Sequence, residues 1–275
     1  MAAGYEKVAI AGTGTIACGL AAVASTTGDE VVVLARSDDS AERAKASIEK
    51  FAGKLEGADA SKVKVTTDRA DLDGCDLVVE AIVEEVSAKG ELLSALGDAL
   101  PDADLATTTS SLGVAAIGDA AGHSDRVFGL HPFNPVPRMD LVELCVLDRS
   151  KDGISDRATA WCEAIGKTVV PVPDTAGFVV NRLLFPSLFD AVRFQVASGV
   201  PPEDVDSCMN LGAAHPLGPL ALLDLVGLDV SQAIGEALFA ESGDEAHKPP
   251  ERLAELIAEG KLGRKSGAGF FDYSS

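Results

Sequence analysis

The 275-residue chain is poor in cysteine, histidine and positive charge. Its five cysteines are an odd number without a CxxC pair, and its four histidines lack ligand-like spacing, so we expect neither a disulfide framework nor a metal site. Lysine and arginine together number 23 against 43 acidic residues, a net charge of −20. A field of that sign repels nucleic acid and anionic membrane, so any phosphate-bearing ligand must be met by local donors.

Long apolar runs are also missing. No window approaches the roughly 18 apolar residues that a membrane-spanning helix needs, and Met1 to Gly12 lacks the features of a signal peptide. We therefore expect a cytoplasmic protein with no membrane or nucleic-acid partner. With 47% hydrophobic residues and a mean hydropathy of +0.18, the chain can bury a substantial core in one large or two modest domains.

A glycine-rich turn near the amino terminus has the pattern of a dinucleotide site. A short apolar run leads directly into Gly12-Thr-Gly14-Thr-Ile-Ala17 and a helix of small residues. Gly12 permits a tight turn, Gly14 lets the backbone approach a pyrophosphate, and Ala17 is small enough for close helix packing. Thr15 and Ile16 complete the turn, where the helix N-terminus faces the phosphates. We expect all five to bind the cofactor.

The end of the second predicted strand bears on which nicotinamide cofactor is bound. NAD enzymes usually carry an acidic residue there for the ribose 2′-hydroxyl, but this chain has Ala35-Arg36-Ser37. Loss of the carboxylate removes repulsion against a 2′-phosphate, and Arg36 and Ser37 supply donors for it. The sequence thus predicts NADP(H) in preference to NAD(H). In the alternative, Asp38 or Asp39 binds the hydroxyl and Arg36 is solvated.

Apolar runs alternate with helical patterns as far as residue 172, which predicts a parallel sheet covered on both faces. Beyond residue 177 there are only helical segments punctuated by glycine and proline. We predict an α/β fold, with a Rossmann-type doubly wound, mostly parallel sheet in residues 1–177 and an all-helical domain in residues 178–275. The predicted strands are residues 5–11, 30–34, 63–66, 76–82, 104–109, 127–130 and 167–172.

Polar residues follow three of these strands. Glu84, Ser110 and His131 each come after a different strand, and the carboxyl ends of strands in such sheets form the ligand crevice. We therefore expect the three side chains to converge. For Ser110 a helix N-cap is the competing interpretation, because Ser-Ser before an apolar run is ordinary capping chemistry.

His131 precedes Glu143 by twelve residues in the segment HPFNPVPRMDLVEL. Imidazole titrates near neutrality, and a carboxylate on its far nitrogen fixes the tautomer and stabilises the imidazolium. The three prolines restrict φ and push the preceding residues towards extended backbone, so the loop positions side chains at little entropic cost. The segment predicts a rigid acid–base dyad. The alternative is a satisfied strand-end histidine and a solvated carboxylate.

Seven segments in chain order carry a family resemblance: GTGTIA, DLVVEAIVEEVSAK, TTSSL, HPFNPVPRMDLVEL, DTAGFVVNRLL, HPLGPLALLDLVGLD and LGRKSGAGFFDY. Together they resemble the short-chain L-3-hydroxyacyl-CoA dehydrogenase family over nearly the whole chain. The resemblance implies that His131 is the catalytic base, Glu143 its partner, and Ser110 and Asn181 the residues that orient the substrate. From its helix-end position alone, Asn181 has a structural role as the alternative.

The resemblance also assigns residues around the cofactor and substrate. It places Glu84, Lys89 and Lys265 near the nicotinamide cofactor and Asn134 in substrate binding, and it implies a homodimer formed through the helical domain. In the implied reaction, His131 removes the 3-hydroxyl proton as hydride passes from C3 to the nicotinamide.

The segment after the second strand departs from the family, whose helical hairpin there helps to seat the CoA nucleotide. In this chain, residues 41–57 are followed quickly by the next strand, so carrier specificity is open. Arg43, Lys50 and Lys54 are seven and four apart, so we expect them on one helix face. They would meet the phosphates of CoA or of an acyl carrier protein's phosphopantetheine; the alternative is a solvated face paired with glutamates.

The expected substrate is a short-chain thioester such as 3-hydroxybutyryl-CoA. One alternative keeps the chemistry but acts on a carrier-protein-bound 3-hydroxyacyl unit or a free 3-hydroxy acid. An alternative of another class is a cofactor-binding structural or sensor protein that has lost catalysis. The intact set of Ser110, His131, Glu143 and Asn181 argues against that alternative.

Overall fold

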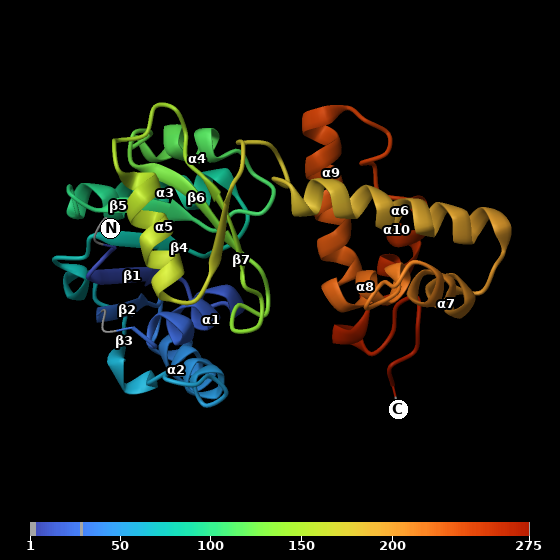
Figure 1. Ribbon diagram of the computed structural model, residues 1–275, viewed down its shortest axis with the longest axis horizontal. Helices are drawn as coiled ribbons and strands as arrows, with labels where there is room; N and C mark the ends of the chain where they lie inside the picture. Colours follow the sequence, from blue (N-terminus) through green and yellow to red (C-terminus); the bar gives the residue numbers. More distant parts are fainter. Residues whose placement is uncertain (1–3, 28–29, 275) are drawn as a thin grey trace. The chain divides into compact units, whose positions relative to one another are not determined.

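The computed structural model describes residues 4–27 and 30–274 of the chain. It divides into two compact units, Met1–Thr175 and Ala176–Ser275. The first unit combines a sheet with helices, and the second contains helices (Figure 1). The predicted fold class, a doubly wound mostly parallel sheet with a helical carboxyl-terminal part, is confirmed.

One sheet forms the centre of the first unit. Among the described residues its strands are β1 (Lys7–Ala11), β2 (Glu30–Leu34), β3 (Val63–Thr66), β4 (Leu77–Glu80), β5 (Asp104–Thr107), β6 (Val127–Pro132), β7 (Leu141–Cys145) and β8 (Thr168–Pro171). They lie in the order β3-β2-β1-β4-β5-β6-β7-β8. The first six strands are parallel in the Rossmann order, whereas β7 is antiparallel to β6 and β8 is parallel to β7.

Strand β7 is the element that the sequence prediction missed. Its five residues follow a proline-rich loop, and the run is too short to give a periodic signal of its own. The strand forms because β6 supplies an antiparallel partner for its backbone groups. The remaining predicted strands are present, with ends that differ by at most two residues.

Helices connect the strands of the first unit and follow one another in the second. In the first unit, the residues described contain α1 (Thr15–Ala24), α2 (Asp38–Ala52), η1 (Ala60–Lys62), η2 (Arg69–Leu72), α3 (Val86–Ala99), α4 (Val114–Ala121) and α5 (Ile154–Ala164). In the second unit they contain α6 (Val180–Ser198), α7 (Pro202–Gly212), α8 (Pro219–Val226), α9 (Leu228–Ser242), α10 (Glu251–Ala258) and η3 (Arg264–Ser266). Within the described ranges, no helix is long and apolar enough to cross a membrane.

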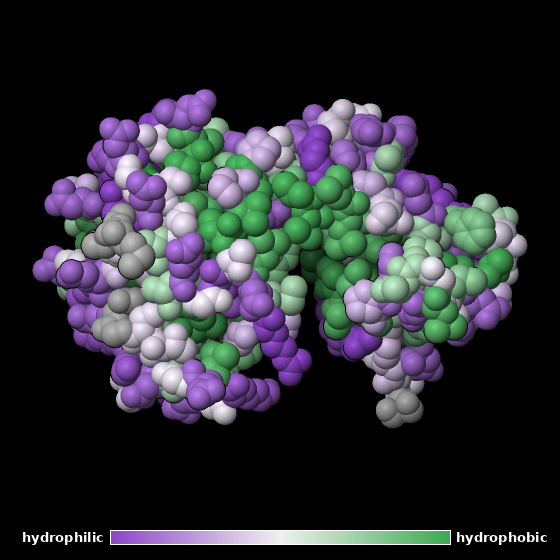
Figure 2. Space-filling view, in the orientation of Figure 1, coloured by the Kyte–Doolittle hydropathy of each residue, from purple (hydrophilic) through white to green (hydrophobic). Residues whose placement is uncertain are grey.

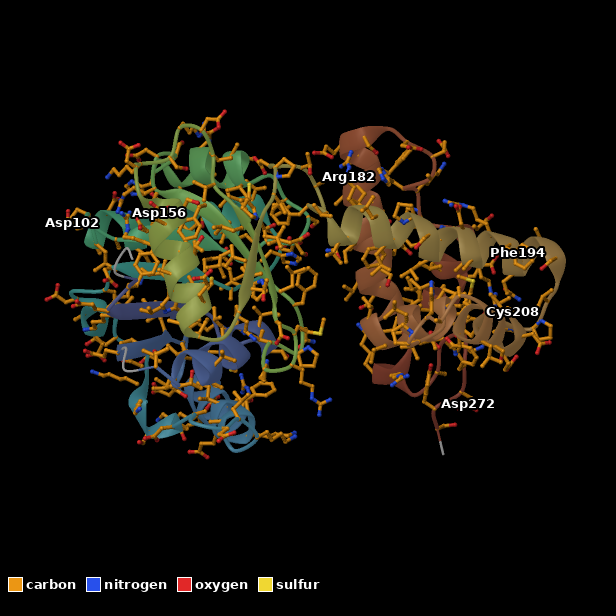
Figure 3. The ribbon with its side chains drawn as sticks, viewed as in Figure 1. Asp102, Asp156, Arg182, Phe194, Cys208 and Asp272 are labelled. Atoms are coloured by element: carbon orange, nitrogen blue, oxygen red, sulfur yellow. The ribbon has the colours of Figure 1, made fainter. Side chains whose placement is uncertain are left out.

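The helical unit has its own apolar core and also exposes apolar side chains. Phe185, Phe189 and Leu238 are among its buried residues. Figure 2 shows both hydrophilic and apolar side chains on the surface of each unit. Phe194, near the end of α6, is more than half exposed, and its side chain lies at the outside of the unit (Figure 3).

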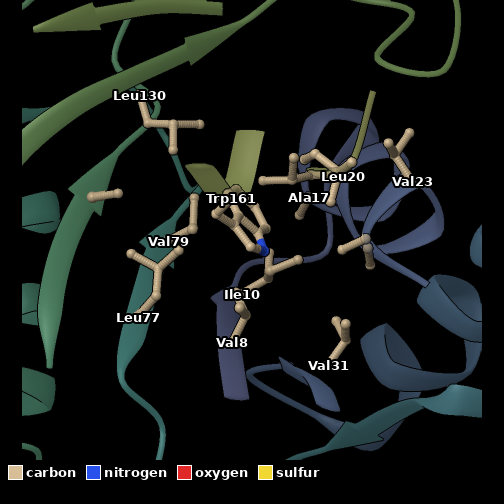
Figure 4. Close-up of a cluster of buried hydrophobic side chains, with 14 of the residues drawn as sticks. Val8, Ile10, Ala17, Leu20, Val23, Val31, Leu77, Val79, Leu130 and Trp161 are labelled. Atoms are coloured by element: carbon tan, nitrogen blue, oxygen red, sulfur yellow. The ribbon is translucent and has the colours of Figure 1, made fainter. Parts of the chain in front are cut away.

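Both faces of the sheet are buried at its central strands. On one face, Trp161 of α5 lies among Ile10, Val79 and Leu130 of the strands, close to Leu20 of α1 (Figure 4). Neighbouring strand residues point to the opposite face, and Val78, Leu105 and Val127 are also fully buried there. Helices α3 and α4 cover that second face, where an added Cβ on Gly90 would stand 2.6 Å from the Cβ of Ala120. The carboxyl ends of the strands are therefore the edge where ligands can reach the sheet.

Candidate active site

The glycine turn after β1 has the geometry of a phosphate site. Gly12 has φ +144°, and an added Cβ would stand 2.2 Å from the Ala81 carbonyl oxygen, so only glycine fits. Gly14 is the N-cap of α1 and an added Cβ there would meet open space. Within the described ranges no side chain caps this helix, so the amides of Thr15 and Ile16 in its first turn, together with the helix dipole, can bind an anion. The residues present fit a dinucleotide pyrophosphate.

The end of β2 presents Arg36 and Ser37 at the start of α2. Arg36 is exposed, and the Ser37 hydroxyl caps α2 by accepting a hydrogen bond from the Ser40 amide at 3.3 Å. Asp38 Oδ1 accepts a hydrogen bond from the Thr67 hydroxyl at 3.3 Å. The Ser37 hydroxyl therefore has a structural bond in addition to any contact with a cofactor.

Glu84, after β4, organises the loop that carries Ser110. Its Oε1 accepts hydrogen bonds from the Thr109 hydroxyl at 2.7 Å, the Ser110 amide at 2.7 Å and the Ser111 amide at 3.0 Å. Burial acts to raise the pKa of Glu84, but the charge of Lys89 and these hydrogen bonds outweigh it and hold the pKa below its usual value. The structure thus brings Glu84 and Ser110 together, as predicted from the strand ends.

Lys89 forms a buried ion pair with Glu80, a residue that the sequence analysis did not select. The two side chains are 1% and 0% exposed, with Nζ 2.8 Å from Glu80 Oε1. Glu80 also accepts hydrogen bonds from the Ile82 amide and the Thr107 hydroxyl, at 2.7 Å each. Nζ lies 3.3 Å from Glu84 Oε2 as well, so Lys89 links the two carboxylates. Glu80 could have been selected from the sequence, because it stands within an apolar strand run and a buried charge requires a partner.

His131 and Glu143 are directly opposite each other on β6 and β7. The imidazole Nδ1 lies 2.8 Å from Glu143 Oε2, and both side chains are buried. Because a carboxylate can only accept, Nδ1 carries the proton in this hydrogen bond. The Phe133 ring is tilted by 59° against the imidazole with centroids 4.6 Å apart. The predicted pairing of His131 with a carboxylate on its far nitrogen is present, on adjacent antiparallel strands.

The sheet places the other candidates of the first unit along the same edge. β4, β5 and β6 are adjacent and parallel, so Glu84, Ser110 and His131 follow the carboxyl ends of neighbouring strands. Asn134 is exposed in the loop after β6. Lys50 is the exception: it is exposed near the C-terminal end of α2, which leads from the carboxyl end of β2 back towards the amino end of the parallel strand β3, so it lies away from this edge.

The expectation that Lys54 shares a helix face with Arg43 and Lys50 is wrong. Helix α2 ends at Ala52, with Gly53 as its C-cap, so Lys54 lies beyond the helix. The predicted short connection is confirmed, because a single α-helix and the 3₁₀ turn η1 lead to β3.

Two candidates belong to the helical unit. Asn181 lies in the first turn of α6 and is buried. Lys265 is exposed in η3, where Nζ contacts Asp229 Oδ2 at 2.7 Å. In the part of the chain that the structure describes, no group of three or more histidine, cysteine, aspartate or glutamate side chains is arranged to hold a metal ion.

Known proteins and family models match almost the whole length of the chain. Residues 7–175 match the family model "3-hydroxyacyl-CoA dehydrogenase, NAD binding domain", and residues 177–273 match "3-hydroxyacyl-CoA dehydrogenase, C-terminal domain". The probable 3-hydroxybutyryl-CoA dehydrogenase of Deinococcus radiodurans is 39% identical, over 97% of this chain and 100% of that protein. The human mitochondrial hydroxyacyl-coenzyme A dehydrogenase is 38% identical, over 98% and 91%. The crystal structure of (S)-3-hydroxybutyryl-CoA dehydrogenase PaaH1 from Ralstonia eutropha matches with a TM-score of 0.92 at 33% identity, over 98% of this chain and 100% of that chain.

Proposed function

Because the chain belongs to the 3-hydroxyacyl-CoA dehydrogenase family, we propose that it interconverts a short-chain (S)-3-hydroxyacyl-CoA, such as 3-hydroxybutyryl-CoA, and the 3-ketoacyl-CoA. The observation that carries the proposal is the buried hydrogen bond between His131 and Glu143 at the carboxyl edge of a Rossmann sheet. This is where an acid–base group has to stand to serve a ligand bound along that edge.

In this proposal His131 is the acid–base group. With the Nδ1 proton donated to Glu143, Nε2 exchanges the proton of the substrate 3-hydroxyl, and Glu143 stabilises the imidazolium that forms on oxidation. Ser110 and Asn181 orient the hydroxyl and thioester oxygens, with Asn134 also in contact with the substrate. When bound, a nicotinamide cofactor takes up or supplies the hydride. The first turn of α1, Glu84 and Lys265 would hold that cofactor, and the buried Lys89 would act there through its ion pair with Glu84.

The substrate test is a parallel assay with three substrates that share the reacting group. Purified protein is incubated with acetoacetyl-CoA, an acetoacetyl carrier protein or free acetoacetate, and consumption of NADPH and NADH is followed. We expect the fastest turnover with acetoacetyl-CoA. Turnover confined to the carrier-protein thioester or the free acid would replace the proposed substrate, and no turnover with any of them would favour a non-catalytic cofactor-binding role.

We also propose that NADP(H) is preferred over NAD(H), because of Arg36. Its exposed guanidinium stands at the start of α2, whereas Asp38 is hydrogen-bonded to Thr67. Arg36→Leu is expected to lower the ratio of kcat/KM for NADPH to that for NADH about 10- to 100-fold, as loss of one charged hydrogen bond implies. Arg252→Leu, at a partly exposed arginine of α10 that is hydrogen-bonded to Glu255, serves as the control. An unchanged ratio in Arg36→Leu would contradict the preference.

A homodimer formed through the helical unit is proposed as well. Leu183 on α6 and Leu211 on α7 are 70% and 88% exposed, and burial of such side chains favours association. Light scattering should give a mass twice the 28.2 kDa of the chain. The double variant Leu183→Glu/Leu211→Glu should shift the mass towards that of one chain, whereas Val170→Glu in the first unit should not. A single-chain mass for the unaltered protein would refute the dimer.

A further inference from the structure

Lys167, directly before β8, fastens the loop between β6 and β7 by two hydrogen bonds to the backbone. Its ammonium donates to the Val136 carbonyl at 2.6 Å and to the Met139 carbonyl at 2.9 Å. The residue is 7% exposed, and burial lowers the pKa of the amine, against the opposing charge of Asp140. A buried ammonium costs desolvation energy that a methionine would not, so its presence here calls for a role.

The opposite side of the loop is seated on the helix of the candidate phosphate site. Val136 is almost completely buried, and a Cβ built on Gly19 of α1 would stand only 3.0 Å from its Cβ. The Cδ of Pro137 would lie 3.5 Å from the same added Cβ of residue 19. The loop is therefore held between the ammonium of Lys167 and the backbone of α1.

This loop carries two groups that border the proposed reaction. Phe133 packs against the imidazole of His131, and Asn134 follows it. The ladder of β6 and β7 fixes the two ends of the loop through the pairs at His131 and Pro132. Its middle depends on the turn in which the amide of Met139 donates to the Pro135 carbonyl at 3.1 Å, and this turn is the part that Lys167 fastens.

We propose that Lys167 is a positioning residue for the dehydrogenase reaction. By fixing the carbonyls of Val136 and Met139, it holds Phe133 against the His131 ring and keeps Asn134 directed at the acyl thioester. The inference rests on the proposed function, since it assigns Lys167 to the same site. The proposal requires that release of the loop lowers kcat/KM for the acyl substrate more than it weakens binding of the cofactor. The reason is that the loop contacts α1 at Gly19, which follows the first turn to which we assign cofactor binding.

Kinetics of Lys167→Met and Lys167→Arg test the positioning role. In Lys167→Met we expect kcat/KM for acetoacetyl-CoA to fall about 10- to 100-fold, the loss typical of a displacement near 1 Å, with the Kd of the cofactor unchanged. Lys167→Arg should recover part of the loss, because the guanidinium keeps charged donors. Lys151→Met, an exposed lysine in the same unit, is the control. Unchanged kcat/KM in folded Lys167→Met, or equal losses for substrate and cofactor, would overturn the proposal.

A second variant, Gly19→Ala, disturbs the same loop at its contact with α1. The added methyl group would press on Val136, while alanine favours the helix, so this variant should fold even if Lys167→Met does not. The same selective fall in kcat/KM for the acyl substrate is expected. Unaltered kinetics in Gly19→Ala would count against the proposal.

Amide hydrogen exchange separates this inference from the proposed function, because it needs no turnover. Exchange in residues 133–140 should be faster in Lys167→Met than in the unaltered protein and in Lys151→Met. If exchange in residues 133–140 is faster in Lys167→Met but the unaltered protein fails to reduce acetoacetyl-CoA, the contact between Lys167 and the loop is supported and the proposed function is wrong. If exchange in 133–140 is unchanged while the unaltered protein is active, the positioning role of Lys167 is rejected.

Discussion

His131→Ala is expected to lower kcat for reduction of acetoacetyl-CoA about 10²- to 10⁴-fold, the usual contribution of a general acid–base group. The side chain removed is the one whose Nδ1 is bonded to Glu143 and which we assign to proton exchange with the substrate. Because the loss falls on the chemical step, the Kd of the cofactor should stay unchanged. Stopped-flow measurement of the first turnover separates this step from product release.

Two further variants sharpen that experiment. Glu143→Gln keeps an acceptor for Nδ1 but removes the charge that stabilises the imidazolium, so its loss should be smaller than that of His131→Ala. His215→Ala, at an exposed histidine of the helical unit, is the matched control and should retain activity. Activity of His131→Ala close to that of the control would show that another group transfers the proton.

Lys89→Met is expected to destabilise the first unit by about 3–5 kcal/mol, because it leaves Glu80 buried without its counter-charge. The hydrogen bonds from Ile82 and Thr107 remain, but they do not neutralise the carboxylate. The double variant Glu80→Gln/Lys89→Met removes both charges and should be markedly more stable than Lys89→Met alone. Urea denaturation of the cofactor-free protein measures the free energy of unfolding.

An exposed ion pair provides the control for that series. Lys151 lies 3.6 Å from Asp125 with both side chains about half exposed, so Lys151→Met should change stability by less than about 0.5 kcal/mol. Two results would contradict this expectation: Lys89→Met is no more destabilising than Lys151→Met, or the double variant is the least stable of the three. Either result would show that Lys89 does not stabilise the protein by neutralising Glu80.

Much of the sheet could be predicted because its central strands are buried on both faces. Such strands appear in the sequence as continuous apolar runs, and β2 has the predicted bounds. β3 also has the predicted bounds, although it is an edge strand in which only Val63 is buried. The glycine turn could be predicted because Gly12 faces a backbone carbonyl at a distance that only glycine tolerates. Local chemistry is sufficient in both cases.

The parts that the sequence did not reveal depend on partners distant along the chain. Strand β7 acquires its pairing from β6, so the twelve-residue spacing of His131 and Glu143 became interpretable as a cross-strand pair only with the register. Lys167 bonds backbone carbonyls, which have no signature in side-chain patterns. Lys54 was placed on a helix that ends at Ala52, because helix ends are poorly defined by periodicity.

The central claim is hydride transfer to C3 of a 3-ketoacyl-CoA with the His131–Glu143 dyad as acid–base group. The most direct test is a single turnover of acetoacetyl-CoA with NADPH deuterated at C4 of the transferred face, followed by mass spectrometry of the product. The account predicts 3-hydroxybutyryl-CoA with one deuterium at C3, and loss of this product in His131→Ala. Unreacted acetoacetyl-CoA with both NADPH and NADH, or a product without deuterium at C3, would contradict it.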